Sequence, residues 1–346
     1  MAHPLRQAAQ LAGNTARFGW YYGMNWLMDR QAVRLGAKPA YKPTRPVPTR
    51  QELMTDLAAV FLADAAAVRE GLYSPTTEDA EPLSSHLARL RLMMADLPGA
   101  IGRREAEDAL TARRLPAAEG LPEYFTQDFH FQTGGYLSED SAKLYDVQVE
   151  TLFYGSANPM RRSALRPIAE FMRGQDQRKL ALLDVACGTG RFLRQVRLAF
   201  PALKLSGIDL SSTYLAEAAC HMAGVRPAEF IDGNAETIPL ADATQDIVSC
   251  IFLFHELPPL VRRRVAAEMA RVLKPGGLLV FIDSLQMGDR PGWDGLLEAF
   301  PVRFHEPYYR HFTIDDLDGL FTDAGLLPVS TAPVFLSKLM VRRKAA

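Results

Sequence analysis

The chain has 346 residues, of which 48% are hydrophobic and 23% are charged, the balance of an ordinary globular protein long enough for two domains or one enlarged domain. Its formal net charge of −1 offers no general attraction for nucleic acid, which we therefore exclude as a partner. No apolar run approaches the roughly 18–20 residues that span a bilayer.

The three cysteines, Cys187, Cys220 and Cys250, lie far apart in the sequence. None of them forms a Cys-x-x-Cys pair, so the pattern indicates neither a zinc site nor a disulfide framework. Free thiols in a chain without an evident secretory signal favour a cytoplasmic location.

Residues 1–120 are expected to form an N-terminal helical region. The first fifty residues carry eight basic side chains and one acidic side chain, and residues 18–28 are rich in aromatics. This composition fits packing against the rest of the protein, a peripheral membrane or lipid contact through residues 17–50, or a contact within a homodimer. Gly19 and Gly23 argue against a long regular helix there.

Helix signals follow a proline-rich connector that includes Pro39 and Pro48. Thr49 and Glu52 form a capping-box pattern at the start of one helix. A second helix is expected over about 83–97, stopped by residues 97–99, and a third over about 102–114. Nothing in this region indicates catalysis.

Residues 121–175 are expected to form a lid or connector. The stretch from Tyr124 to Tyr136 combines aromatic, polar and glycine residues, which suits a loop over a ligand. Helices are expected over about 138–153 and 161–173.

Residues 176–346 alternate between strand and helix patterns. Strands are expected near 180–185, 203–209, 230–232, 246–253, 278–283, 326–333 and 335–342. The alternation predicts an α/β fold with a doubly wound, mostly parallel seven-stranded sheet. The last two strands are joined by a short turn, so one of them should be antiparallel. A helix between them and the fifth strand is expected to cap at Thr313.

The chain is organised around residues 180–193, which read as a buried strand, a tight glycine loop and a helix. The loop is Asp184-Val185-Ala186-Cys187-Gly188-Thr189-Gly190. A nicotinamide-binding fingerprint would require a glycine or alanine where Leu193 stands.

The loop resembles motif I of the class I S-adenosylmethionine (SAM) methyltransferases. Asp209 at the end of the second strand, Asn234 after the third, and the turn at 274–277 resemble the family's next motifs in order. Within the family, the chain loosely resembles the ubiquinone/menaquinone branch, methyltransferase type 11. The resemblance implies SAM as the cofactor and an acid near its sulfonium, with Asp209 accepting from the ribose hydroxyls. The expected cofactor contacts are Asp184, Ala186, Gly188, Gly190, Asp209, Leu210, Asn234, Ala235 and Phe252.

The resemblance also implies a methyl transferase that aligns a nucleophile in line with the SAM methyl. His255, in the loop after the fourth strand, is the candidate base because its ordinary pKa lies near neutrality. The expected acceptor contacts are Tyr136, Tyr145, His305, Glu306, Tyr308, Tyr309 and His311. The histidines and the acid of the 305–311 cluster show no metal-ligand spacing, so no metal is expected.

A small, apolar acceptor is favoured: a lipid, a quinone-like ring or a polyketide. Methyltransferases of bases or amides usually carry an Asn/Asp-Pro-Pro-aromatic motif, where this chain has residues 254–257, Phe-His-Glu-Leu. Two alternatives stay open, a protein methyltransferase and a non-catalytic protein that binds SAM or its product. The sequence leaves open whether carbon, oxygen or nitrogen is methylated.

Overall fold

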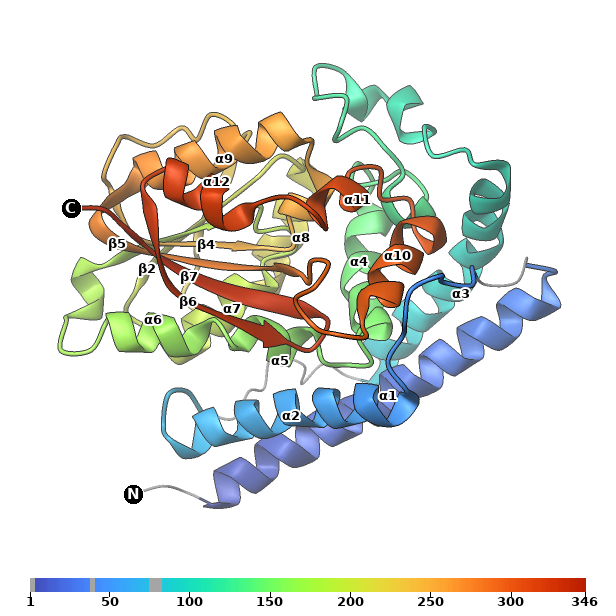
Figure 1. Cartoon of the computed structure of the whole chain (residues 1–346), viewed down its shortest axis with the longest axis horizontal. Helices are drawn as coiled ribbons and strands as arrows, with labels where there is room; N and C mark the ends of the chain where they lie inside the picture. The colour runs from blue at the N-terminus through green and yellow to red at the C-terminus, as the bar shows by residue number, and fades with distance from the viewer. Residues whose placement is uncertain (1–3, 38–40, 75–82) are drawn as a thin grey trace.

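The computed structural model describes residues 4–37, 41–74 and 83–346, and its centre is one seven-stranded sheet (Figure 1). The strand order is β3-β2-β1-β4-β5-β7-β6. Strands β1 to β5 pair in parallel, and β7 is antiparallel to both β5 and β6. The strands are β1 Ala181–Val185, β2 Lys204–Asp209, β3 Glu229–Asp232, β4 Gln245–Ile251, β5 Leu273–Ser284, β6 Leu326–Val334 and β7 Ser337–Lys344. The expected fold class is therefore confirmed.

Helices cover both faces of the sheet because successive strand residues point to opposite sides. Leu182 packs into the core beneath α6 and α7, and its neighbour Leu183 packs into the core beneath α9 and α12. Figure 1 shows these two helix layers on opposite sides of the strands. The helices of this part of the chain are α6 Leu165–Phe171, α7 Arg191–Ala199, α8 Ser212–His221, α9 Pro259–Val272, α10 Asp294–Arg303, α11 Tyr309–Phe312 and α12 Leu317–Asp323.

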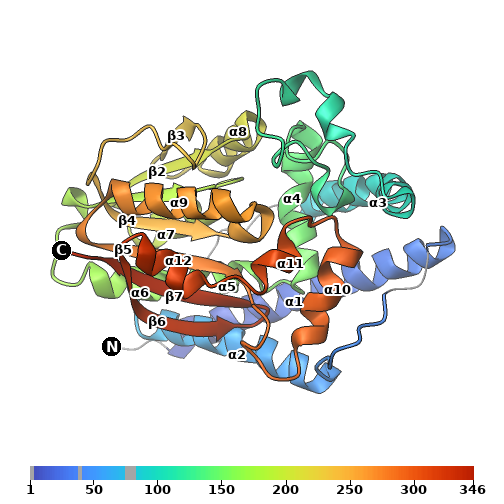
Figure 2. The same cartoon turned by 45° about the horizontal axis from the view of Figure 1, so that its top comes forward.

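The N-terminal helices pack directly on this sheet domain. They are α1 Pro4–Arg34, α2 Arg50–Arg69 and α3 Leu83–Ala106, followed by α4 Glu139–Leu152 and α5 Ala157–Arg162. On α2, the buried Asp64 forms a bidentate ion pair with Arg162 of α5, at 2.7 and 2.8 Å. Figure 2 shows α1 and α2 beneath the sheet and α3 beside α4. The boundaries expected near residues 120 and 175 stay a prediction.

Helix α1 corrects one expectation, because it continues through Gly19 and Gly23 without a break. Packing overrides the poor helix propensity of glycine here. Tyr21 and Met24 are buried against Met93 of α3 and residues of α4. Favourable contacts on this face therefore stabilise the helix that the glycines alone would weaken.

Helix α3 corrects a second expectation, because Pro98 lies inside it rather than ending it. The helix continues to Ala106, where Ile101 is buried and Arg103 donates to the carbonyl of Phe131 at 2.6 Å. These tertiary contacts outweigh the hydrogen bond that proline removes. The expected third helix is reduced to a 3₁₀ turn, Ala112–Arg114, with a second turn at Pro116–Ala118.

The helix ends follow the sequence signals in one case and depart from them in others. The Thr49–Glu52 capping box is confirmed in both directions. The last helix is capped by Asp316, which accepts from the Gly319 N–H at 2.8 Å, so Thr313 was the wrong cap. The helix expected over 161–173 is two short helices, α5 and α6. In the connector, Pro39 lies outside the described residues.

None of the helices in the described part of the chain combines the length and hydropathy needed to cross a membrane.

Candidate cofactor and acceptor site

The glycine loop after β1 makes the sharp turn that its sequence indicates. Ala186, Gly188 and Gly190 have positive φ angles of 55°, 53° and 71°. At Gly190, the first residue before α7, a Cβ atom would lie 2.9 Å from the Cβ of Ala218. Glycine is therefore needed there both for the backbone conformation and for the approach of α8.

Asp209, at the end of β2, fixes this loop through hydrogen bonds to its backbone. One carboxylate oxygen accepts from the Gly188 N–H at 2.8 Å, and the other accepts from the Ser211 N–H at 2.9 Å. Burial raises the pKa of Asp209. The backbone donors favour the charged carboxylate and lower this pKa, but burial is the larger effect. Each oxygen keeps a lone pair for a further donor.

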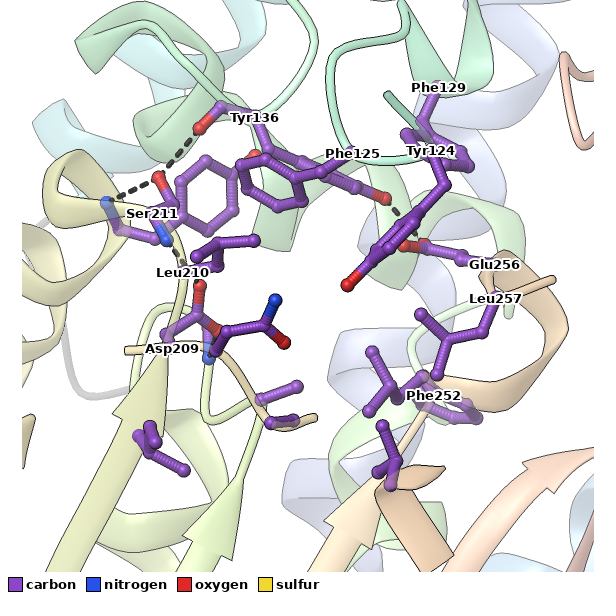
Figure 3. A pocket seen from close by; sticks show the side chains of 18 of the residues that line it. Tyr124, Phe125, Phe129, Tyr136, Asp209, Leu210, Ser211, Phe252, Glu256 and Leu257 are labelled. Carbon is purple, nitrogen blue, oxygen red and sulfur yellow. Dashed lines mark hydrogen bonds between the residues drawn. The ribbon is translucent and has the colours of Figure 1, made fainter. Parts of the chain in front are cut away.

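A cavity opens beside this loop at the carboxyl ends of the strands, with about 790 Å³ of empty volume including the part open to solvent (Figure 3). This size is typical of a cofactor pocket. We call it the cofactor cavity. Of the expected cofactor contacts, it is lined by Ala186, Gly188, Asp209, Leu210, Asn234, Ala235 and Phe252.

Asp184 and Gly190 do not border this cavity. The Asp184 side chain is buried between β1 and β4, where it accepts from the Ser249 hydroxyl at 2.6 Å. Burial raises its pKa to about 7, and the nearby Asp209 adds to this. The structure thus brings Asp209 to the cavity and keeps Asp184 behind the loop, and a direct contact between Asp184 and the cofactor stays a prediction.

An aromatic cover, residues 124–136, lies over the cofactor cavity. Its Tyr124, Phe125, Phe129 and Tyr136 side chains line the cavity. Figure 3 shows Tyr136 held at two points: its carbonyl accepts from the Ser211 hydroxyl at 2.6 Å, and its hydroxyl donates to Glu256 at 2.5 Å. The sequence indicated a loop over a ligand here, and the three other aromatics were not among the expected contacts.

A second cavity, of about 680 Å³ including open space, adjoins the first. The two share Tyr145, Phe252 and Glu256 as lining residues. The walls of the second are mostly apolar: Val149, Leu152, Phe153, Leu296, Leu297, Phe300 and Leu336. We call it the apolar cavity. It has the character of a site for an apolar ligand next to a cofactor.

His255 and Asp283 form a buried pair at the edge of the apolar cavity. The Nδ1 atom of His255 lies 2.6 Å from Asp283, whose other oxygen accepts from the Phe254 N–H at 2.7 Å. Burial alone would lower the pKa of His255, but the acidic groups around it, Asp283 first and then Glu306 and Glu256, together outweigh burial and raise this pKa to about 10. Since Asp283 holds Nδ1, the Nε2 atom, which lies 3.8 Å from Glu256, is the one that can meet a ligand.

The expected acceptor contacts separate into two groups. Tyr136 lines the cofactor cavity, Tyr309 lines the apolar cavity, and Tyr145 lines both. The other four, His305, Glu306, Tyr308 and His311, line neither. His305 lies 2.8 Å from the Gln127 amide oxygen, and His311 lies 3.0 Å from Arg262 on the surface side.

A third cavity, of about 1090 Å³ including open space, lies between the N-terminal helices and α4. It shares His130, Tyr145, Val149 and Leu152 with the apolar cavity, and α1 contributes Met28 and Ala32 to its wall. The N-terminal region thus extends the space that is open to an apolar ligand.

Three functional candidates were not found from the sequence: His130, Glu256 and Asp283. Asp283 ends β5, and acids at the carboxyl ends of parallel strands meet at one edge, so this signal was present. Glu256 follows His255 directly. His130 gave no signal, because only the tertiary fold brings its loop to the cavity.

The fold and this loop define a class. A mostly parallel seven-stranded sheet with a final antiparallel strand, a glycine loop after β1 and an acid after β2 is the arrangement of a SAM-dependent methyltransferase. A sequence model of the family described as methyltransferase domain matches residues 182–277.

Named relatives agree with this class. The chain is 32% identical over 166 residues to the ubiquinone/menaquinone biosynthesis C-methyltransferase UbiE of Methylobacterium nodulans, and the aligned part is 47% of this chain and 63% of that protein. It is 32% identical over 167 residues to the demethylmenaquinone methyltransferase of Thermotoga maritima, and the aligned part is 48% of this chain and 68% of that protein. The chain thus spans under two thirds of the first relative's length. The chain belongs to the class I SAM-dependent methyltransferases.

The fold comparison reaches into the N-terminal half. Human N-acetylserotonin methyltransferase in complex with SAM has a TM-score of 0.51 at 16% identity, covering 75% of this chain and 70% of that one. Membership of the SAM-dependent methyltransferase family, shown by the matching sequence model and the named relatives, gives SAM as the cofactor. The cofactor cavity fits it, since Asp209 offers carboxylate acceptors and Gly188 leaves space beside the backbone.

Proposed function

We propose that this methyltransferase transfers the SAM methyl group to a small apolar acceptor that binds in the apolar cavity. The observation that carries the proposal is the junction of the two cavities at Tyr145, Phe252 and Glu256. A ligand on one side of this junction faces a ligand on the other, which is the placement that an in-line transfer requires.

In the cofactor cavity, Asp209 would accept hydrogen bonds from the ribose hydroxyls, and Asn234 would meet the adenine amino group. The Asn234 amide oxygen accepts from the Glu236 N–H at 2.8 Å and keeps one lone pair for that contact. SAM supplies an activated methyl group, so the chain's main tasks are orientation and the exclusion of water.

His255 would act as the base for an acceptor with an acidic hydroxyl or carbon. Its Nδ1 atom is held by Asp283, so the proton would move to Nε2 at the wall of the apolar cavity. With a pKa of about 10, the imidazole of His255 is protonated near neutral pH in the chain without ligands. The positive sulfonium in the adjoining cavity would lower this pKa and so favour the neutral imidazole that can accept a proton. Base assistance of this kind contributes roughly 10²–10⁴-fold to a rate.

The acceptor is proposed to be a quinol-like ring with an apolar substituent. The names of the relatives concern ubiquinone and menaquinone biosynthesis, and the lining of the apolar cavity agrees with such a ligand. The third cavity gives space for an apolar substituent beyond the ring.

The test incubates the full chain with SAM and a series of hydroquinones with and without apolar tails, followed by mass spectrometry. We expect a product heavier by one methylene for tailed acceptors, and a strong loss of product with His255→Gln. His86→Gln is the matched control, because His86 lies on α3 against Trp20 and lines neither cavity. Methylation of a polypeptide in place of every small acceptor would overturn the proposal.

A peripheral membrane contact through α1 is proposed as the route for such an acceptor. Trp26 and Val33 are 54% and 75% exposed, and Arg30 lies over the Trp26 ring at 4.7 Å. Exposed apolar and basic side chains on one helix suit an anionic bilayer surface. Sedimentation with anionic vesicles should be lost in Trp26→Ser/Val33→Ser, and binding equal to that of the parent chain would contradict this route.

A further inference from the structure

Three side chains from three separate segments converge beside the junction of the two cavities. They are His130 in the 3₁₀ turn Phe129–Phe131, Glu256 in the 3₁₀ turn Phe254–Glu256, and Glu306 between α10 and α11. One ligand atom from each lies within 4.8 Å of the other two. We propose that His130, Glu256 and Glu306 bind a first-row transition-metal dication.

Glu306 is the observation that points to a missing partner. Its side chain has 0% exposure, and neither carboxylate oxygen has a hydrogen-bond partner among the described residues. A buried carboxyl group without a hydrogen-bond partner is unfavourable, and native proteins pair such groups or use them to coordinate metal ions. His130 lies toward Glu306, with its Nε2 atom 3.4 Å from the nearer oxygen.

The separation of these atoms fits an ion between them. Nitrogen and oxygen ligands bound to zinc at about 2.0–2.2 Å in a tetrahedral arrangement lie about 3.4 Å apart. The His130–Glu306 separation already has this value, at 3.4 Å. All three ligand atoms lie within 4.8 Å of one another, so small side-chain rotations would bring them around one ion.

The type of ligand narrows the choice of ion. An imidazole nitrogen suits zinc, iron or nickel, whereas magnesium and calcium prefer oxygen alone. One imidazole with two carboxylates therefore favours a dication of the series from Mn²⁺ through Zn²⁺ over Mg²⁺ or Ca²⁺. Tyr136 orients the site further, because its hydroxyl donates to Glu256 at 2.5 Å (Figure 3).

The site faces the space where the acceptor is proposed to bind. Glu256 lines both cavities and His130 lines the apolar cavity. Three protein ligands leave at least one coordination position for an oxygen of a ligand. The metal site itself depends only on these side chains and not on the identity of the acceptor.

The test measures metal binding directly and needs no methyl transfer. The full chain is freed of metal with a chelator and titrated with ZnCl₂ and MnCl₂ by calorimetry, with MgCl₂ for comparison. We expect one Zn²⁺ or Mn²⁺ per chain, bound at least 100-fold more weakly by His130→Ala and Glu306→Gln. Glu236→Gln is the matched control, because Glu236 also accepts from a tyrosine, Tyr124 at 2.8 Å, outside the cluster. This variant should bind the ion as the parent chain does.

Two further measurements keep the test decisive. Without metal, Glu306→Gln replaces a buried carboxyl group that lacks a hydrogen-bond partner with a neutral side chain of similar shape, so its melting temperature should equal or exceed that of the parent chain, and added Zn²⁺ should raise only the parent's melting temperature. X-ray absorption of the zinc-loaded parent chain should show nitrogen and oxygen ligands. Sulfur ligands, which would indicate the exposed Cys220, or the absence of stoichiometric binding, or equal binding by all variants, would overturn the proposal.

Discussion

Replacing Asp209 with asparagine tests the cofactor site most directly. Each oxygen of this carboxylate accepts one backbone N–H, from Gly188 and from Ser211. Asparagine turns one of these oxygens into an NH₂ group, which faces a backbone donor instead of accepting from it. The same change removes one of the two charged acceptors proposed for the ribose.

The magnitude follows from the loss of one hydrogen bond to a charged group. Such a bond contributes about 1.5–3 kcal/mol, so the Kd for SAM should rise roughly 10–150-fold. The unsatisfied backbone N–H should also lower the free energy of unfolding by about 1–3 kcal/mol. Isothermal titration calorimetry with SAM and with S-adenosylhomocysteine measures the first effect, and urea unfolding measures the second.

Asp232→Asn is the control, because Asp232 ends the neighbouring strand β3, is exposed, and does not line the cofactor cavity. Its affinity for SAM should match that of the parent chain. The reasoning would be refuted if folded Asp209→Asn bound both ligands within about twofold of the parent chain.

Three other variants test separate parts of the structure. Gly190→Val should lower the free energy of unfolding by about 1–3 kcal/mol or more, measured in urea, because φ is +71° and Ala218 leaves no room for a Cβ. Asp283→Asn should lower kcat about 10²-fold with little change in KM, because His255 loses the carboxylate that holds its tautomer. Buried cations outweigh burial and lower the pKa of Asp146 to about 2, so the charged form contributes stability above pH 4 that is lost as the pH falls toward 2. The stability difference between the parent chain and Asp146→Asn should shrink over that interval, when melting temperatures are compared.

Each of these variants has a contradicting result. An unchanged urea midpoint for Gly190→Val would show that the loop can relax around a side chain. Equal losses in kcat and in folded fraction for Asp283→Asn would indicate a structural role alone. A stability difference for Asp146→Asn that is independent of pH would show that its charge is not what stabilises the fold.

The sheet was predictable because its strands alternate regularly with helices and its loops contain residues typical of turns. Gly188 and Gly190 mark the cofactor loop, and Asp209 follows the next strand. The hydrophobic periodicity of the strands and the turn residues after them therefore located both the loop and the acid. The helical region was less predictable, because Gly19, Gly23 and Pro98 lie inside helices that long-range packing stabilises.

The site was predictable where it follows strand ends and not where it depends on tertiary contacts. His255 could be proposed from its position after β4, whereas its hydrogen bond to Asp283 depends on the register between β4 and β5. His130 and Glu306 are separated by more than half the chain, and no local pattern connects them. The expectation that Glu306 touches the acceptor arose from an aromatic cluster, yet its buried carboxylate lines neither cavity.

Helix α4 carries two adjacent residues with different tasks. Tyr145 is a wall of both cavities, and Asp146 accepts from the Thr189 hydroxyl and from Arg191, both at 2.8 Å, in the turn that begins α7. An acceptor that shifts Tyr145 therefore also disturbs the hydrogen bonds from Thr189 and Arg191 to Asp146, which connect the same helix to the glycine loop. Thermodynamic reciprocity then requires that SAM change the affinity for the acceptor by the same factor by which the acceptor changes the affinity for SAM.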